Sequence, residues 1–187
     1  FEVHLVEDDR SVWWARAQVG DPYRETPVFR SAIRTIEFNP TWTVPLGILE
    51  RDVLPAIQRD PVAALQKRKL EVYDRQGRRV DPRRINWRRY TARTLPFRLV
   101  RAPGPENPMG LVKFLFPNPF AVYIHDTPDK RGFEEDKRAL SAGCIRLERP
   151  FELAERLLAS QGDWDQETIL KVIDAGRTRR LTLTRPM

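Results

Sequence analysis

Two stretches of alternating apolar and polar positions open the chain. Val3–Val6 and Val12–Val19 follow this pattern and are separated by a polar run at 7–10. A period of two residues is typical of a strand with one buried face, and a short polar run between two strands favours a hairpin. Strand patterns recur at Val112–Phe116 and at Val122–His125. We therefore predict a sheet that begins with an N-terminal hairpin.

Apolar residues at helical spacing predict helices in the middle and near the end of the chain. Leu49–Gln66 has this spacing and is interrupted at Pro61, because proline lacks an N–H and fixes its own φ. Pro150–Ser160 and about Asp165–Ala175 each gather apolar residues on one face. Strand and helix patterns together predict a mostly β chain with helices, an α+β fold.

Strand and helix patterns are mixed in the middle of the chain. Leu70–Tyr73 and Arg78–Val80 flank a polar turn at 74–77 and predict a second hairpin. A short helical piece is predicted near Pro82–Tyr90. Residues 46–95 are therefore a predicted insertion of mixed structure between strands of the sheet.

The composition is that of one globular domain. The chain has 187 residues, of which 41% are hydrophobic and 32% charged, so it can bury a good core. No apolar run approaches the length that crosses a membrane. The chain opens inside an apparent strand, without an initiator methionine or a signal-like segment, and we expect a fragment of a longer precursor.

The formal net charge of +7 raises nucleic acid as a partner, since basic surfaces collect phosphates. The best basic and aromatic patch consists of Arg83, Arg84, Trp87, Arg88, Arg89 and Tyr90. No nucleic-acid module frames this patch, and 26 acidic residues are dispersed among the 33 basic ones. A solvated face is favoured, and we expect no nucleic-acid partner.

The residues that carry chemistry are few. The chain has one cysteine, Cys144, and two histidines, of which His125 ends an apolar strand pattern. A thiol attacks a carbonyl as the thiolate, and imidazole is the usual base that takes its proton. The pair predicts a cysteine nucleophile with a histidine base, and the alternative is a small buried cysteine with a core histidine. Two histidines and one cysteine lack metal-ligand spacing, so we expect neither a metal nor a cofactor.

The local setting of each residue favours the catalytic interpretation. Ser141, Ala142 and Gly143 precede Cys144 and allow a tight turn that brings backbone N–H groups toward the sulfur, as an oxyanion hole requires. His125 is followed by an exit turn at 126–128. Both residues are predicted at strand ends, where catalytic groups are often presented.

These residues match a known family. His125-Asp126-Thr127-Pro128 and the later Ser141-x-Gly143-Cys144-x-Arg146 resemble the L,D-transpeptidase catalytic domain, also called the YkuD domain. The runs at 39–45, 103–107 and 110–118 resemble its large periplasmic YcbB-type branch. One position departs from the family pattern, because the family usually has a second histidine where this chain has Ala142.

The resemblance implies a fold and a reaction. The expected fold is a YkuD-type β-sandwich or barrel-like core, in which 1–187 form one catalytic domain and 46–95 form a capping subdomain. The expected activity is peptidoglycan L,D-transpeptidation, in which a donor tetrapeptide stem loses D-alanine and its meso-diaminopimelate carbonyl is transferred to an acceptor stem. The implied partners are peptidoglycan peptide stems, the implied location is the periplasm of a Gram-negative bacterium, and carbapenems are expected to acylate the cysteine.

Site roles follow from the motifs and the resemblance. The expected catalytic set is Cys144 as nucleophile, His125 as general base and acid, Gly143 as a backbone oxyanion donor, and Asp126, whose backbone carbonyl orients the imidazole. The expected substrate-binding set is Arg146, Ser141, Tyr123 and Trp42. The Asp126 side chain has the alternative role of capping its turn, and Ser141 that of tying the turn before the cysteine.

Other functions stay open on the sequence. Water, a lipoprotein lysine or a free D-amino acid are alternative acceptors, and the first of these would make the domain an L,D-carboxypeptidase. A catalytically degenerate module that only binds peptidoglycan is the non-enzymatic alternative, because Ala142 departs from the family pattern. Sortases use the same order of histidine, cysteine and arginine, but their threonine-rich approach to the cysteine is absent here.

Overall fold

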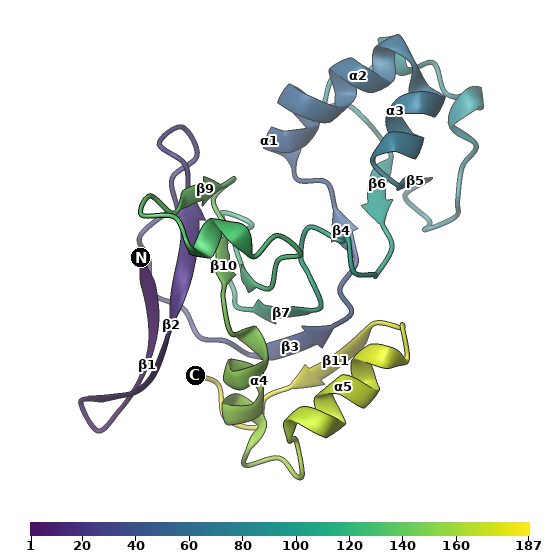
Figure 1. Ribbon diagram of the computed structural model, residues 1–187. Coiled ribbons are helices and arrows are strands. Elements are labelled where there is room, and N and C mark those ends of the chain that lie inside the picture. Colours follow the sequence, from purple (N-terminus) through teal and green to yellow (C-terminus); the bar gives the residue numbers. More distant parts are fainter. The chain divides into compact units, whose positions relative to one another are not determined.

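The computed structural model describes residues 1–187, which form two compact units. The first unit comprises residues 1–40 and 103–187, and the second comprises residues 41–102 (Figure 1). The second unit is thus inserted between two parts of the first. Each unit has a hydrophobic core of its own.

The first unit is an eight-stranded mixed sheet with two helices. Its strands are β1 (Glu2–Glu7), β2 (Arg10–Gly20), β3 (Thr35–Phe38), β7 (Val112–Leu115), β8 (Ile124–His125), β9 (Ala139–Ser141), β10 (Ile145–Leu147) and β11 (Arg179–Thr182). The strand order is β1-β2-β10-β8-β7-β3-β11, and β9 pairs with β2. The β10–β8 and β2–β9 pairs are parallel, and the others are antiparallel. In Figure 1, β3 and β11 run across the direction of β2, so the sheet is strongly twisted.

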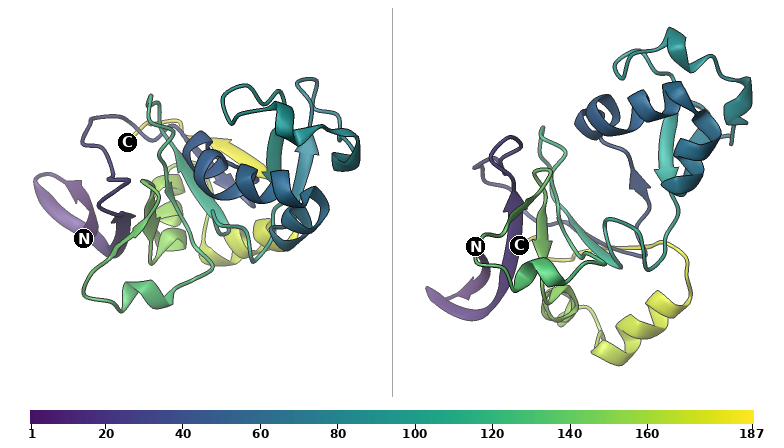
Figure 2. Two further views of the ribbon diagram at one scale, coloured as in Figure 1. Left: turned by 90° about the horizontal axis from the view of Figure 1, so that it is seen from above. Right: turned by 45° about the horizontal axis from the view of Figure 1, so that its top comes forward.

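The predicted N-terminal hairpin is confirmed. β1 and β2 pair antiparallel, and the loop between them extends away from the rest of the first unit (Figure 2). Its two turn residues, Asp8 and Asp9, have φ of 49° and 61°. Positive φ at both turn positions matches the right-handed twist of the flanking strands.

The predicted strand Val122–His125 is shorter in the structure. Only Ile124 and His125 lie in β8. Asn118 holds the preceding loop, since its side chain accepts from the Val122 N–H at 3.1 Å and donates to the Val122 carbonyl at 2.9 Å. These local hydrogen bonds replace the ladder that a longer strand would form.

One face of the large sheet carries the core of the first unit. Helices α4 (Pro150–Leu158) and α5 (Gln166–Asp174) supply buried leucine, alanine, isoleucine and valine side chains to it. The sheet residues of this core include Ile36, Phe38, Val112, Phe114 and Leu147. Both helices were predicted and are confirmed. The Asp165 carboxylate caps α5 by accepting from the Thr168 N–H at 2.8 Å.

The second unit combines a three-stranded antiparallel sheet with short helices. Its elements are β4 (Trp42–Thr43), α1 (Leu46–Ile48), the π-helical turn Leu49–Val53, α2 (Leu54–Arg59), α3 (Pro61–Lys67), β5 (Leu70–Tyr73), two 3-10 turns (Pro82–Arg84 and Trp87–Arg89) and β6 (Arg98–Arg101). The sheet order is β4-β6-β5. The unit extends beyond the expected 46–95 at both ends because β4 pairs with β6 and closes it.

One sequence prediction in this unit is confirmed and another differs from the structure. The helical region Leu49–Gln66 is divided at Asp60, whose carboxylate accepts from the Ala63 N–H at 3.0 Å and caps α3. The predicted hairpin after β5 is reduced to a single bridge between Tyr73 and Arg79, because β6 is the strand that pairs with β5 along its length.

The basic and aromatic patch has a buried centre. Trp87 is only 3% exposed and its indole N–H donates to the Pro82 carbonyl at 2.9 Å. A buried indole offers no face on which a base can stack.

The combination of sheets and helices in the two units confirms the predicted α+β fold class. None of the helices combines the length and the apolar composition that a membrane span requires.

Candidate active site

Six polar side chains cross the sheet on the face opposite the core. Residues paired directly across neighbouring strands share a face of the sheet. The registers place opposite one another, in the order β11-β3-β7-β8-β10-β2, the residues Arg180, Glu37, Lys113, His125, Arg146 and Gln18. We call these six residues the polar row. Apolar core residues alternate with them along the strands, so burial of one face fixes the polar row on the other.

His125 is the buried centre of the polar row. Its side chain is 4% exposed, and its Nδ1 forms a short hydrogen bond with the backbone carbonyl of Asp126. A carbonyl oxygen can only accept, so Nδ1 carries the proton and Nε2 carries the lone pair. This is the orientation that a general base requires, and it has the geometry expected of Asp126 as backbone orienter.

Burial keeps the imidazole neutral. It lowers the pKa of His125 from 6.5 to about 4, although the Asp126 carbonyl acts in the opposite direction. The neighbouring cations Arg146 and Lys113 lower this pKa further. At neutral pH His125 is therefore an unprotonated base rather than an imidazolium.

The carboxylate of Asp126 holds the loop that lies next to His125. It accepts from the Leu111 N–H at 2.9 Å and from Lys130 Nζ at 2.6 Å. Gly110 has φ +62°, and a Cβ placed there would lie 2.3 Å from the Asp126 carboxylate. The side chain of Asp126 therefore fixes the turn, while its backbone carbonyl orients the imidazole.

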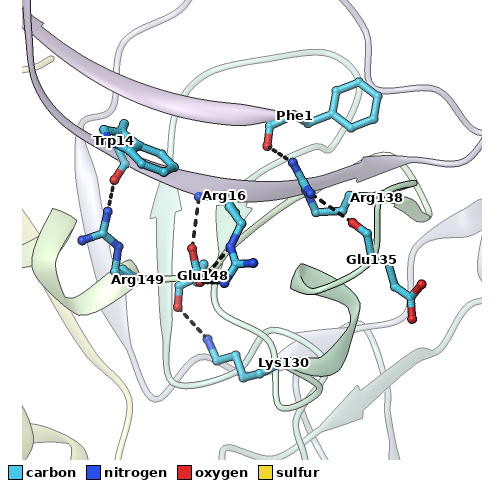
Figure 3. Close-up of polar contacts among 8 residues, drawn as sticks. All are labelled: Phe1, Trp14, Arg16, Lys130, Glu135, Arg138, Glu148 and Arg149. Atoms are coloured by element: carbon cyan, nitrogen blue, oxygen red, sulfur yellow. Dashed lines mark hydrogen bonds and ion pairs between the residues drawn. The ribbon is translucent and has the colours of Figure 1, made fainter.

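A polar network secures this turn to the strands around it. Lys130 also donates to the Glu148 carbonyl at 3.2 Å, and Glu148 forms an ion pair with Arg16 of β2 at 2.5 Å (Figure 3). The hydrogen bond from Arg16 lowers the pKa of Glu148, which therefore stays ionised. The segment after His125 is thus fastened to β2 and to the residue that follows β10.

The turn before the cysteine is held by Ser141. Its hydroxyl donates to the Cys144 carbonyl at 2.5 Å and accepts from the Gly143 N–H at 3.1 Å. Gly143 has φ +112°, a conformation that favours glycine. The Gly143 N–H is therefore committed to Ser141, contrary to the expectation that it is open to an oxyanion. The Cys144 N–H donates to no protein group.

Thr26 orients the peptide group that carries this free N–H. Its hydroxyl accepts from the Gly20 N–H and donates to the Gly143 carbonyl, both at 2.9 Å. The Gly143 carbonyl and the Cys144 N–H belong to one planar peptide group. Fixing the carbonyl therefore fixes the direction of the N–H. Nothing in the irregular segment 21–34 signals this role in the sequence.

The thiol of Cys144 is partly buried beside β8. Burial raises its pKa above 9.0, while the backbone N–H of Tyr123 and the cations Lys113 and Arg146 act in the opposite direction. The resting site is therefore a neutral thiol with a neutral imidazole.

The parallel pairing of β10 with β8 brings the thiol near His125. Arg146 lies opposite His125, and Cys144 precedes Arg146 by two residues. Cys144 and His125 therefore lie on neighbouring segments at the same edge of this strand pair.

The expected substrate-binding residues lie in different surroundings. Arg146 donates to Gln18 Oε1 at 3.0 Å, and its Nε is buried without a partner. The ring of Tyr123 lies 3.7 Å from Lys113 Nζ. Ser141 is 1% exposed and uses its hydroxyl within the turn. Trp42 belongs to the second unit, where it packs partly buried against that unit's core. Their contacts with substrate stay predictions.

Sequence reasoning missed Lys113, Glu37 and Gln18. The available signal was a polar residue between buried apolar neighbours, as Lys113 stands between Val112 and Phe114. That signal marks the face of a strand, but the neighbours across the sheet depend on the strand order. No group of three or more histidine, cysteine, aspartate or glutamate side chains is arranged to hold a metal ion.

The matches to known proteins include residues of both units of this chain. The family model for the L,D-transpeptidase catalytic domain, YkuD, matches residues 1–173. A Haemophilus influenzae protein named "Putative L,D-transpeptidase" is 32% identical over 178 residues, which are 95% of this chain and 36% of that protein. The chain thus spans about a third of the length of this curated relative. The matched residues include the strand pair β8–β10, and the chain belongs to the YkuD family of L,D-transpeptidase catalytic domains.

Proposed function

We propose that this domain cross-links peptidoglycan stems by acyl transfer through a thioester on Cys144. The observation that carries the proposal is the buried neutral His125 on β8, the strand that pairs with β10 next to the cysteine. Its Nδ1 donates to the Asp126 carbonyl. The partly buried thiol of Cys144 lies on the segment that leads into β10, the neighbouring strand. Membership of the family supports the same reaction.

Acylation begins with proton transfer from Cys144 to His125 Nε2. The sulfur attacks the meso-diaminopimelate carbonyl of a donor tetrapeptide, and the electron pair of the C=O bond moves to oxygen. The Cys144 N–H is the donor best placed for this oxyanion, a contribution of about 3 kcal/mol in comparable sites. The oxyanion then re-forms the C=O bond, the C–N bond to D-alanine breaks, and the imidazolium gives its proton to the departing amine. The thioester remains.

General base catalysis fits the electrostatics of the site. Neither group is charged at rest, because burial lowers the pKa of His125 and raises that of Cys144. The imidazolium therefore exists only between the two proton transfers. Lys113 and Arg146 favour the negative charge that develops on sulfur and disfavour a lasting imidazolium.

Deacylation uses the reverse proton path. The amine of an acceptor meso-diaminopimelate attacks the thioester, His125 takes its proton, and the thiol is restored. We also propose that the domain acts in the periplasm of a Gram-negative bacterium. We also propose that the second unit is a capping subdomain.

Product analysis tests the proposal. The protein is incubated with purified disaccharide tetrapeptides, and products are separated by liquid chromatography with mass detection. We expect D-alanine and a cross-linked dimer, and neither product with Cys144→Ala. Formation of tripeptide without dimer would show that water resolves the thioester, and the activity would then be hydrolysis instead of transfer. Retention of the disaccharide tetrapeptide on the protein without any product would favour the binding-module alternative.

A further inference from the structure

Lys113 is a half-buried cation without an acidic partner. It lies opposite Glu37 in the polar row, yet the Glu37 carboxylate pairs with Arg180 from the next strand. No carboxylate lies within 4.0 Å of Lys113 Nζ, whose neighbour is the ring of Tyr123 at 3.7 Å from its centroid. Burial lowers the pKa of Lys113, and Glu37 and Cys144 oppose this effect from a distance. The ammonium group is therefore partly desolvated and lacks a full counter-charge.

The strand order separates the two cations that flank the base. Lys113 is on β7 and Arg146 is on β10, so His125 on β8 lies between them. Cys144 directly precedes β10 and therefore lies on the Arg146 side. Lys113 is nevertheless close enough to act on the nucleophile as well, since its charge, like that of Arg146, lowers the pKa of the Cys144 thiol.

The leaving group of a donor stem carries a negative charge next to the bond that breaks. The departing amine must reach His125 to receive the proton, while the acyl carbon stays with the sulfur. In a donor stem the carbon next to this amine carries the terminal carboxylate. That carboxylate is therefore bound close to His125, where Lys113, unlike Arg146, has no hydrogen bond to a protein group.

We propose that Lys113 binds the terminal carboxylate of the residue that leaves the donor stem. This inference rests on the proposed function and adds the group that selects a donor with a free C-terminus. The carboxylate supplies the counter-charge that Lys113 lacks. It also weakens the repulsion between Lys113 and a protonated His125, so donor binding makes the base stronger when it is needed.

The test compares two donors on three proteins. Acylation of Cys144 is followed by intact-protein mass with a tetrapeptide that ends in a free carboxylate and with its C-terminal carboxamide. Wild type is expected to prefer the carboxylate by roughly 10- to 100-fold, the range for a charge-assisted hydrogen bond. Lys113→Met is expected to lose this preference by slowing with the carboxylate alone, and Lys113→Arg to keep most of it.

Lys171→Met is the matched control. Lys171 is exposed on α5, which packs on the opposite face of the sheet, so this variant is expected to keep the wild-type preference. Melting temperatures of all variants verify that they fold, and the preference is a ratio within one protein, which a loss of folded fraction does not change.

The outcomes separate the two proposals. A full carboxylate preference in Lys113→Met would overturn the role of Lys113, and its loss in Arg146→Met instead would assign the carboxylate to the other cation. Absence of acylation of folded wild type by either donor would overturn the proposed function, and the role of Lys113 with it.

Discussion

At the scale of single residues, the site combines a base and a nucleophile that burial keeps neutral. His125 is 4% exposed and is oriented by the carbonyl of Asp126. Burial also raises the pKa of the Cys144 thiol. Both groups therefore gain charge only when a substrate carbonyl draws the proton from one to the other.

The buried imidazole makes stability depend on pH. In the unfolded chain His125 binds a proton below about 6.5, whereas the folded protein resists it until about 4. The free energy of unfolding is therefore expected to fall by about 3 kcal/mol between pH 6.5 and 4. Urea unfolding at several pH values measures this slope. The same slope in His125→Asn as in wild type would contradict the assignment.

Alkylation of Cys144 reports its charge state. Because burial raises the pKa of the thiol, the rate of reaction with iodoacetamide is expected to climb with pH through 9. A thiolate paired with imidazolium would instead give a rate that is already constant between pH 6 and 8. Mass spectrometry of the single thiol measures the rate directly, and such a plateau would refute the general-base account.

Thr26 is expected to act through the Cys144 N–H. Thr26→Val keeps the shape and removes both the donor to the Gly143 carbonyl and the acceptor for the Gly20 N–H. Because only the first of these orients the Cys144 N–H, the acylation rate constant is expected to drop about 5- to 10-fold. Thr26→Ser is expected to restore most of the rate. Single-turnover kinetics separate this effect from donor binding, and a change in binding alone would point to a structural role.

At the scale of elements, the strand pair β8–β10 presents the two reacting groups and the loop at 103–111 supports it. The turn after β8 is closed against this loop by Asp126 and Leu111. Gly110 allows the contact because a hydrogen replaces a Cβ there. The position of the base therefore depends on a glycine outside both strands.

Substitution of Gly110 tests this packing. Gly110→Ala adds a methyl group 2.3 Å from the Asp126 carboxylate and strains a backbone at φ +62°. We expect a loss of about 2–4 kcal/mol in the free energy of unfolding, together with slower acylation. Gly176→Ala is the control, since Gly176 has φ +67° but nothing within 4 Å of its added Cβ. Equal losses in the two variants would show that backbone strain alone is responsible.

Local elements followed from the sequence because their signals are local. The β1–β2 hairpin and the helices α4 and α5 depend on periodicity, turn residues and caps within a few positions. β8 is shorter than predicted because Asn118 binds the backbone of the loop before it. A side chain that competes with a ladder leaves no mark in the alternation of apolar residues.

At the scale of the whole molecule, two units with separate cores are encoded by one chain. The mixture of strand and helix patterns was enough to predict the α+β class, and Cys144 and His125 were evident because such residues are scarce. The polar row was not predictable, because its members come from six strands whose order the sequence does not reveal. The position of Lys113 next to His125 is therefore evident only from the β7–β8 register.

The most direct test of the account is the intact mass of the protein after incubation with a donor tetrapeptide and no acceptor. The account predicts an adduct equal to the donor minus D-alanine, located on Cys144, absent in Cys144→Ala and formed far more slowly in His125→Ala. An unmodified folded protein, or an adduct that persists in Cys144→Ala, would contradict the thioester at its centre.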